Sequence, residues 1–570
     1  MCRVSWFVYW KTCFSFRVLL FVFSRLAPEA DLMVWTILTL SALPAVMLLA
    51  LAAVVPRRDA DAAPLAIRTW VTALAAVQLA VALVLTLGMA LRLTFGSSDP
   101  DAWYAGFSGA GSEALPIYLD GVSTLMFLMV SFIGWVICRY SVRYLDGDRS
   151  QGNYFLWTGF TLAAVALMVL AGHLLVFYIA WLMTSIGLHH LLLHDATRPA
   201  AQRAAWTKFA VIRIADVALA IACILLYREF GTAYLGELFA AVADLSAASV
   251  ALQTAALLLV LAGAIKSAQF PFHTWLPQTL ETPTPVSALM HAGIVNAGGY
   301  LLVRTSPIVS AAPWTLAVLA TIGAVTACYA AVVMLTQTSV KKSLAYSTIA
   351  QMGFMMLQCG LGAFSAALLH IMAHSMYKAH AFLGSGDVIT QRSRVGAVAG
   401  ARSERKSAGG EAPSRMTTGL AAAGVSLCCL ALASLTLGID PATKPGGLVL
   451  GAVLCLAIAH WLEKVFASAD RRLALQSSGF ALALCFLYVF SFRIVDGFVA
   501  DSVPVVTLPV MQWAVIGSII ACGLTTMLWT ERTTTRRGPE SRGGRWYVHA
   551  RNGFYVESVL RRVFGSLSKS

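Results

Sequence analysis

Long blocks without a charged side chain are the most restrictive feature of this sequence. Four of them are Met33–Val55, Thr69–Leu91, Ser343–Tyr377 and Met416–Ile439. A helix needs roughly 20 apolar residues to cross the ~30 Å hydrocarbon layer of a bilayer. A soluble domain could not bury so many, since about a quarter of an average globular sequence is charged and only 12% of this one is. The blocks predict an all-α polytopic membrane protein with about 14–15 transmembrane helices.

Basic residues alternate along the chain between rich and poor loops. The rich loops contain Arg57, Arg58 and Arg68, then Arg139, Arg143 and Arg149, then Arg198, Arg203 and Lys208, then Lys341 and Lys342, then the stretch 392–415, and finally Lys464, Arg471 and Arg472. Lys and Arg accumulate in cytoplasmic loops, so we expect these loops and the C-terminus on the cytoplasmic side of the inner membrane. The net charge of +14 then indicates a face near anionic lipid rather than nucleic-acid binding.

These patterns divide the chain into six segments. They are an N-terminal extension 1–32, transmembrane helices 33–114, a transmembrane core 115–390, a basic loop 391–416, further transmembrane helices 417–531 and a basic tail 532–570. The extension carries Arg3, Lys11, Arg17 and Arg25 on the side where the alternation predicts few charges. It is an extra helix, a signal peptide, or sequence preceding a true start at Met33, which is the interpretation we favour.

The sequence offers no pattern for a redox cofactor or a nucleotide. Its eleven cysteines include no Cys-x-x-Cys pair, which disfavours an iron–sulfur cluster or a zinc ribbon. No GxGxxG follows a strand and no Walker sequence is present. We therefore predict no cofactor, no bound metal and no catalytic site of its own.

Ionisable residues inside apolar spans are the candidate functional residues, because each costs ~2.5 kcal/mol or more at mid-bilayer and is placed toward a bundle interior or water. The first group is Lys208, Arg213 and Asp216. Arg213 and Asp216 are three residues apart on one helix and can form an ion pair. A purely structural pair that holds helices together is an equally open interpretation.

The second group surrounds Lys266, which ends an apolar run. Pro271 and Pro277 follow and predict a broken helix, and His291 lies further on. Broken helices at membrane depth occur where the freed backbone lines a cavity. A partly desolvated lysine there suits a proton carrier, because burial disfavours its charged form. The alternative is a lysine that extends to the membrane interface.

The third group is His370, His374 and Lys378, spaced by four residues on one predicted helix. This spacing stacks them along a single face about one turn apart. Histidine titrates near neutral pH, so the series suits a proton relay. Two histidines four apart could instead bind a metal, but Lys378 extends the same face and no carboxylate joins it.

Several of these motifs resemble one family in the right order. The stretch Lys266-Ser-Ala-Gln-Phe-Pro-Phe-His-Thr-Trp-Leu-Pro277 and the later Pro283-Thr-Pro-Val-Ser-Ala-Leu-Met-His291 resemble the signature of the proton-translocating antenna subunits of respiratory complex I and of multi-subunit sodium/proton antiporters. Val340–Gly353 and the His370 series resemble the next blocks, so the resemblance spans residues 115–390.

The resemblance implies a fold of two inverted five-helix repeats, each with a broken helix. It implies that Lys266 is the central channel lysine and Lys341 a buried lysine of the second half-channel. His291, His370, His374 and Lys378 would lie along the hydrated axis. The helices after residue 390 diverge from the family, and Lys444 is a weak candidate for its later channel lysine.

One departure concerns the channel lysine directly. The family places a glutamate after the tryptophan of the fifth span, whereas Trp181 is followed here by Leu182. Asp216 keeps the family's sixth-span pattern and is the remaining candidate acidic partner.

Other stretches resemble the membrane subunit of the two-component inorganic carbon transporter (DabB). These are Ala292-Gly-Ile-Val-Asn296, the run from Gln358 to Ala367, and the tail Trp546-Tyr-Val-His-Ala-Arg-Asn-Gly-Phe-Tyr555. This resemblance implies a large cytoplasmic zinc-binding partner similar to a β-carbonic anhydrase. It also implies an ion gradient that drives the conversion of CO2 to bicarbonate.

The hypothesis from sequence is therefore a subunit that conducts protons, or another monovalent cation, for inorganic carbon uptake. The path would include Lys266, His291, Lys341, His370, His374 and Lys378. Two alternatives stay open, a proton-pumping subunit of an NADH:quinone oxidoreductase and a sodium/proton antiporter module. The missing glutamate at Leu182 argues modestly against both.

Overall fold

The protein is a bundle of long helices. The computed structural model describes residues 32–95, 117–279, 282–385, 415–438, 445–467, 470–506 and 542–565, with a few positions between 517 and 526. Within these ranges the only extended pairings are two isolated β-bridges, and nine helices are long and apolar enough to cross a membrane. The prediction of an all-α fold is confirmed. The expectations for residues 1–31, for the loop 391–414 and for Lys444 lie outside the described residues.

The first half of the bundle consists of long, nearly uninterrupted helices. They are α2 (Leu32–Val54), α3 (Arg57–Ala62), α4 (Pro64–Phe95), α6 (Gly121–Tyr144), α7 (Gln151–Leu170), α8 (Leu174–Leu192) and α9 (Pro199–Phe230). Local signals set their ends. Asp120 caps α6 by accepting a hydrogen bond from the Ser123 amide, and α9 starts with a proline at its first position and stops at Gly231, whose φ is 72°.

The next part contains two interrupted helices. Its elements are α10 (Leu235–Ala243), α11 (Val250–Lys266), η2 (Phe272–Trp275), α12 (Thr284–Ala292), η4 (Ile294–Asn296), α13 (Ala297–Arg304), α14 (Ser306–Ser310), α15 (Pro313–Thr336), α16 (Val340–Gly360) and α17 (Phe364–Leu383). Helices α15 and α16 cross very closely, because a Cβ on Gly323 would lie 2.3 Å from the Leu357 amide nitrogen. Only glycine permits that approach.

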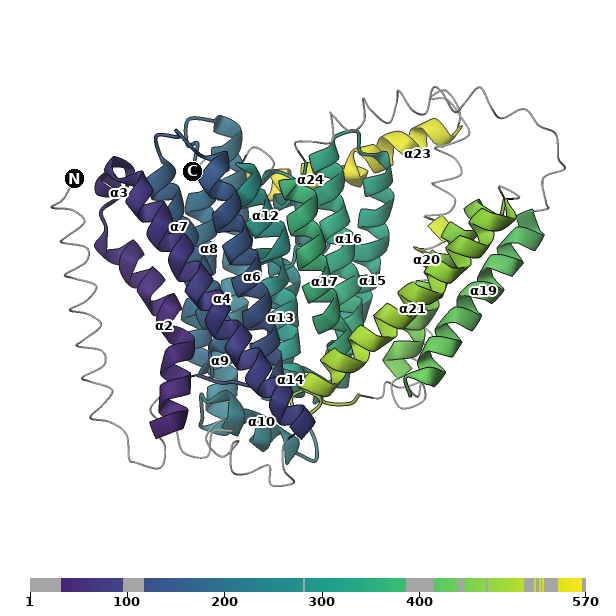
Figure 1. Ribbon diagram of the computed structural model, residues 1–570, viewed down its shortest axis with the longest axis horizontal. Helices are drawn as coiled ribbons and strands as arrows, with labels where there is room; N and C mark the ends of the chain where they lie inside the picture. Colours follow the sequence, from purple (N-terminus) through teal and green to yellow (C-terminus); the bar gives the residue numbers. More distant parts are fainter. Residues whose placement is uncertain are drawn as a thin grey trace.

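The C-terminal elements form a unit of three helices, followed by a tail. They are α19 (Arg415–Thr436), α20 (Pro445–Phe466), α21 (Arg471–Val499), α23 (Arg542–Arg551), η5 (Gly553–Tyr555) and α24 (Val556–Gly565). Helices α19 to α21 bury a small apolar cluster of their own and lean away from the bundle (Figure 1). The end of α21 returns to it at Gly121, where a Cβ would clash with the Phe498 carbonyl oxygen.

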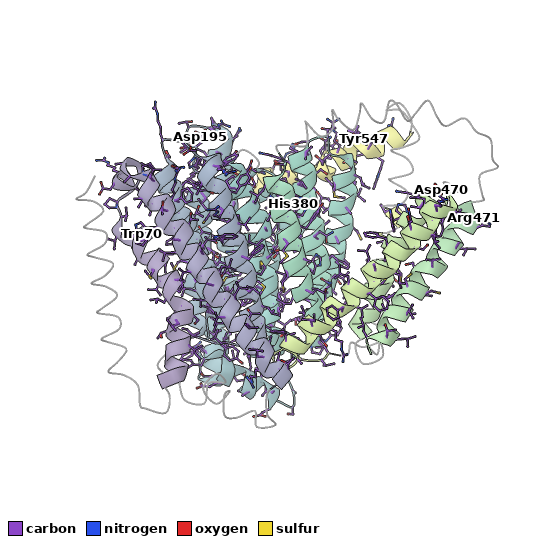
Figure 2. All side chains as sticks on the ribbon, in the orientation of Figure 1. Trp70, Asp195, His380, Asp470, Arg471 and Tyr547 are labelled. Carbon is purple, nitrogen blue, oxygen red and sulfur yellow. The ribbon has the colours of Figure 1, made fainter. Side chains whose placement is uncertain are left out.

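The two ends of the bundle differ in charge. Figure 1 shows α3, α23 and α24 at one end and α10 and α14 at the other. Asp195, in the basic loop before α9, and Tyr547, in the tail, lie at the end that carries α3 (Figure 2). The basic loop before α9 and the basic tail therefore share one end of the molecule, which we call the basic end.

Candidate functional site

Lys266 lies at the point where a membrane-length helix is interrupted. Helix α11 ends at this lysine, and Ala268 then adopts a left-handed φ of 51° before Pro271 and the short η2. Residue Lys266 is only 2% exposed. The interruption brings a lysine and free backbone groups into the interior of an apolar bundle, where irregular backbone lines functional cavities.

The ammonium group of Lys266 is held by neutral groups of α8. Its Nζ donates to Ser185 Oγ at 2.7 Å and to Thr184 Oγ1 at 3.1 Å, and the Trp181 carbonyl oxygen lies 3.4 Å away. The same Nζ sits 4.2 Å from the centre of the Trp181 ring. Two hydroxyl groups, a backbone carbonyl oxygen and an aromatic ring therefore surround this ammonium group.

Asp216, the acidic residue nearest to Lys266, contacts the same tryptophan, Trp181. Asp216 accepts a hydrogen bond of 2.7 Å from Trp181 Nε1. Its other oxygen lies 2.7 Å from Arg213 Nη2, so the two residues three apart on α9 form an ion pair. The carboxylate is buried, and its charge is thus shared between Arg213 and the Trp181 ring that covers Lys266.

Lys208 extends this cluster by one step along α9. It is 1% exposed, and its Nζ donates to the Ser185 carbonyl oxygen at 2.6 Å. Ser185 therefore contacts Lys266 through its hydroxyl and Lys208 through its backbone. Two buried lysines on different helices are joined by one residue, and we call Lys266, Lys208 and Ser185 with Trp181 and Asp216 the lysine cluster.

A second cluster lies where α12, α16 and α17 meet. Lys378 Nζ donates to Ser347 Oγ at 2.8 Å, and His291 Nδ1 lies 3.1 Å from Thr348 Oγ1. The His291 ring stacks on Phe382 with centres 4.3 Å apart. Neutral oxygen atoms again hold a buried lysine, and the described contacts of Lys378 include no carboxylate.

His374 occupies the middle of this second cluster. It is 4% exposed, and neither ring nitrogen has a hydrogen-bond partner in the described structure. His370, His291 and Lys378 are all close enough to interact with it electrostatically. His370 itself is bound to Gln358 Oε1 at 2.8 Å. We call His291, His370, His374 and Lys378 the histidine cluster.

A small cavity lies among α6, α7, α8 and the segment 293–300. Its volume is about 10 Å³, and its lining includes Thr184, which accepts a hydrogen bond from Lys266, together with Asn296 and Tyr300. Asn296 also donates to Ser375 Oγ at 2.8 Å, next to His374 in sequence, and its buried Oδ1 lacks a partner in the described structure. Most of the lining is apolar and comes from methionine and valine side chains of α6 and α7. The cavity is close to the minimum size that holds one water molecule.

Lys341 differs from the position that the family resemblance implied. It is half-buried, and Lys342 beside it is exposed, in the first turn of α16 after Ser339. This turn lies at the basic end, where the side chain can reach water. The expectation of a buried lysine at this position is wrong, because Lys341 is only half-buried.

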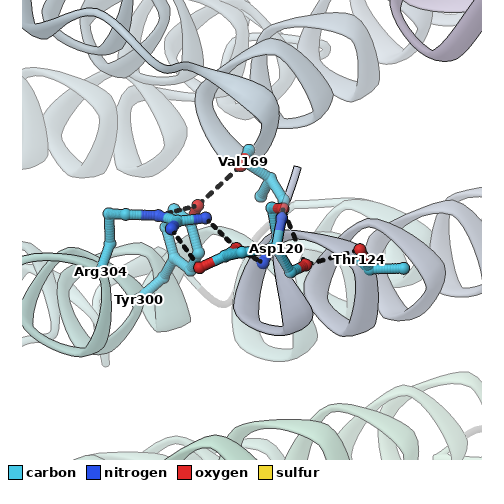
Figure 3. Close-up of polar contacts among 6 residues, drawn as sticks. Asp120, Thr124, Val169, Tyr300 and Arg304 are labelled. Carbon is cyan, nitrogen blue, oxygen red and sulfur yellow. Dashed lines mark hydrogen bonds and ion pairs between the residues drawn. The ribbon is translucent and has the colours of Figure 1, made fainter. Parts of the chain in front are cut away.

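Sequence reasoning missed a buried ion pair at the opposite end of the bundle. Arg304 donates to both carboxylate oxygens of Asp120, at 2.8 and 2.9 Å, and to Tyr300 Oη at 3.2 Å. Tyr300 in turn donates to the Val169 carbonyl oxygen at 2.7 Å (Figure 3). The available signals were an aspartate directly before an apolar run and an arginine at the end of another, but their pairing could not be read from them.

The geometry gives a direct prediction for the relay. Replacing His374 with alanine should lower proton flux by about tenfold or more, because a positioned proton-transfer group contributes at least this much and both ring nitrogens of His374 are without a partner in the described structure. His380→Ala is the matched control, since His380 lies on the same helix and is exposed. Dye-reported proton uptake by liposomes containing each variant measures the effect. An equal loss in both variants, or none in His374→Ala, would remove His374 from the path.

The family comparisons identify an antiporter-like membrane protein. Residues 171–406 match the family described as NADH:quinone oxidoreductase/Mrp antiporter, transmembrane. Residues 110–155 match the N-terminus of complex I chain 5. The Mrp complex from Dietzia sp. DQ12-45-1b shares the fold, with a TM-score of 0.59 at 22% identity over 93% of this chain and 59% of that one.

Curated relatives narrow the assignment. A Halothiobacillus neapolitanus protein named "Probable inorganic carbon transporter subunit DabB2" is 37% identical over 92% of this chain and 93% of its own length. NADH-quinone oxidoreductase subunit L of Escherichia coli is 38% identical, but over only 48% of this chain and 45% of its own. The chain belongs to the DabB family of inorganic carbon transporter subunits, a multi-pass membrane family within the complex I and antiporter group. The resemblance seen in the sequence is confirmed.

Proposed function

We propose that this chain conducts protons, or another monovalent cation, across the inner membrane for an inorganic carbon uptake complex. The observation that carries the proposal is the pair of polar clusters inside an apolar bundle. Each holds a buried lysine on neutral oxygens, Lys266 on Ser185 and Lys378 on Ser347. A buried charge without a counter-ion is costly, so such residues favour a role in passing protons over a role in stability.

The contacts suggest an order for the path. Thr184, a partner of Lys266, and Asn296 line the same small cavity. A bound water there would connect Lys266 through Thr184 to Asn296, and Asn296 reaches Ser375 beside His374. The steps from Lys266 to Thr184 and from Asn296 to Ser375 are within hydrogen-bond distance, as proton transfer requires. The step from Ser375 to His374 would need a further water. Lys341 would serve this path where it meets water.

Arg213 and Asp216 would tune the lysine cluster rather than carry protons. The carboxylate of Asp216 is already held by Arg213 and by Trp181. It contributes a fixed negative charge behind the ring that covers Lys266. This arrangement takes over part of the role of the glutamate that Leu182 replaces.

The carbon-uptake assignment draws on the extent of the similarity. The relative from Halothiobacillus neapolitanus aligns over 92% of this chain, whereas subunit L of Escherichia coli aligns over 48%. Leu182 in place of the family glutamate also favours a machine that differs from the complex I pumps. A proton-pumping oxidoreductase subunit or a sodium/proton antiporter subunit remains the second candidate.

We propose an orientation with the basic end in the cytoplasm, because Lys and Arg accumulate there. The C-terminal tail would then face the cytoplasm. The partner would be a large soluble zinc-binding subunit similar to a carbonic anhydrase, which performs the hydration of CO2. Its contact surface would include the outward side of α23, where Arg545, Val548, His549 and Arg551 are exposed.

The division of labour can be tested by purification. The full-length tagged chain, isolated from its native host, should bring down a large soluble protein with stoichiometric zinc, and a chain lacking residues 536–570 should lose it. The membrane chain stripped of its partner should carry no zinc. Elemental analysis and mass spectrometry measure both results. Stoichiometric zinc on the separated membrane chain would contradict the proposed division, and so would a set of complex I subunits in place of the zinc protein.

A further inference from the structure

Hydrogen bonds and ring contacts hold the C-terminal tail against the bundle near the interrupted helix. Gly553 accepts a hydrogen bond of 2.9 Å from Tyr329 Oη through its carbonyl oxygen, and Arg551 accepts one of 3.1 Å from Gln337 Nε2. The Phe554 ring packs on Tyr329 with centres 6.0 Å apart. The tail therefore binds the ends of α15 and α16 at the basic end, where Figure 1 shows α23 and α24.

This placement changes the interpretation of the tail motif. Tyr547 donates to the Thr336 carbonyl oxygen at 3.5 Å, and Trp546 packs on Phe554 at 5.1 Å. These aromatic residues face the bundle. The tail is thus part of the folded core at this end and can contribute side chains to it.

Glu557, in the first turn of α24, is an acidic side chain that the tail places against the bundle. Its Oε1 accepts a hydrogen bond of 3.2 Å from Gln278 Nε2, which lies just after η2. Tyr329 and Tyr346 are close enough to interact electrostatically with its carboxylate. Glu557 is half-buried, so it can meet both the protein interior and water.

A row of polar groups leads from Glu557 back toward Lys266. His273 of η2 packs against Tyr329, with ring centres 4.9 Å apart, and against Tyr346 at 6.4 Å. Gln269 lies between His273 and Lys266 in the interrupted segment. Both are buried, and His273 Nδ1 and Gln269 Oε1 have no hydrogen-bond partner in the described structure. Unsatisfied buried polar atoms of this kind call for an unseen water or a functional role.

We propose that Glu557 exchanges protons with cytoplasmic water at the end of the path that starts from Lys266, and that His273 and Gln269 connect the two residues. This inference rests on the proposed function. A proton arriving from His273 converts the carboxylate to the acid, and release to cytoplasmic water restores the carboxylate, so charge and protons balance. A tail residue thereby supplies an acidic group to a path that lacks the family glutamate, since Leu182 stands at that position.

The test uses the purified complex in liposomes, with proton flux driven by a potassium diffusion potential. Glu557→Gln should lower the flux about tenfold or more, since a positioned proton-transfer group contributes at least this much. Glutamine keeps a polar contact with Gln278, so the tail should remain docked. Glu557→Asp should restore most of the flux. If Glu557 had only a structural role, the restored flux would not depend on a carboxylate. Asp195→Asn is the matched control, since Asp195 is a half-buried acidic residue at the same end and lies outside the proposed path.

The possible outcomes distinguish a failure of the role proposed for Glu557 from a failure of the proposed conducting function. Normal flux in Glu557→Gln, with flux abolished by Lys266→Ala, would overturn the role of Glu557 and leave the conducting function standing. Loss of flux in Glu557→Gln without rescue in Glu557→Asp would overturn it as well. No flux through the wild-type complex would instead contradict the proposed function.

Discussion

Replacing Lys266 with alanine should abolish carbon uptake while leaving the protein inserted in the membrane. The side chain makes its polar contacts through a single ammonium group, to Ser185, Thr184 and the Trp181 carbonyl oxygen. Removing it leaves hydroxyl groups that can pair with water or backbone, so folding should survive. Loss of a required proton carrier should lower flux by about 100-fold or more. The measurement is growth in air of a host that lacks its own carbon-concentrating system.

Lys342→Ala is the matched control for this experiment. Lys342 is a lysine of the same bundle, but it is exposed at the start of α16. The control should support growth at the level of the wild type. Growth of the Lys266→Ala strain in air, at normal expression, would show that Lys266 is not the essential group.

The second large effect concerns stability. Asp120→Asn should destabilise the protein by roughly 3–5 kcal/mol, because it leaves the buried Arg304 guanidinium without its carboxylate. Both partners are almost fully buried, with side chains 2% and 4% exposed. Asparagine is chosen because it can still cap the start of α6. Thermal unfolding in detergent, together with the yield from membranes, reports the loss.

A double variant separates charge from packing in this prediction. Asp120→Asn combined with Arg304→Met removes both charges, and it should recover much of the stability that the single change loses, since a buried pair is often replaceable by apolar side chains. If the single variant unfolds like the wild type, the Asp120–Arg304 pair does not hold the helices together.

The fold class followed from the sequence because a bilayer imposes it. Blocks such as Thr69–Leu91 are too long and too uncharged for another environment, and α4 forms there. The break after Lys266 was also foreseen, since Pro271 and Pro277 cannot continue a helix. Periodicity placed His370, His374 and Lys378 on one face, and the structure puts all three on α17.

The contacts that define the clusters could not be predicted, because they join distant parts of the chain. Lys266 meets Ser185 across 81 positions, and Arg304 meets Asp120 across 184. Glu557 lies 279 positions from Gln278. No local pattern encodes such pairs. The resemblance also misplaced Lys341, because its depth depends on where α16 begins relative to the end of the bundle.

Proton flux through the purified complex tests the central claim most directly. Liposomes containing the complex and an internal pH-sensitive dye are given a potassium diffusion potential. The account predicts rapid acidification with the wild type, flux near background with Lys266→Ala, and normal flux with Lys342→Ala. Flux that is equal in the wild type and in Lys266→Ala, or absent from both, would contradict it.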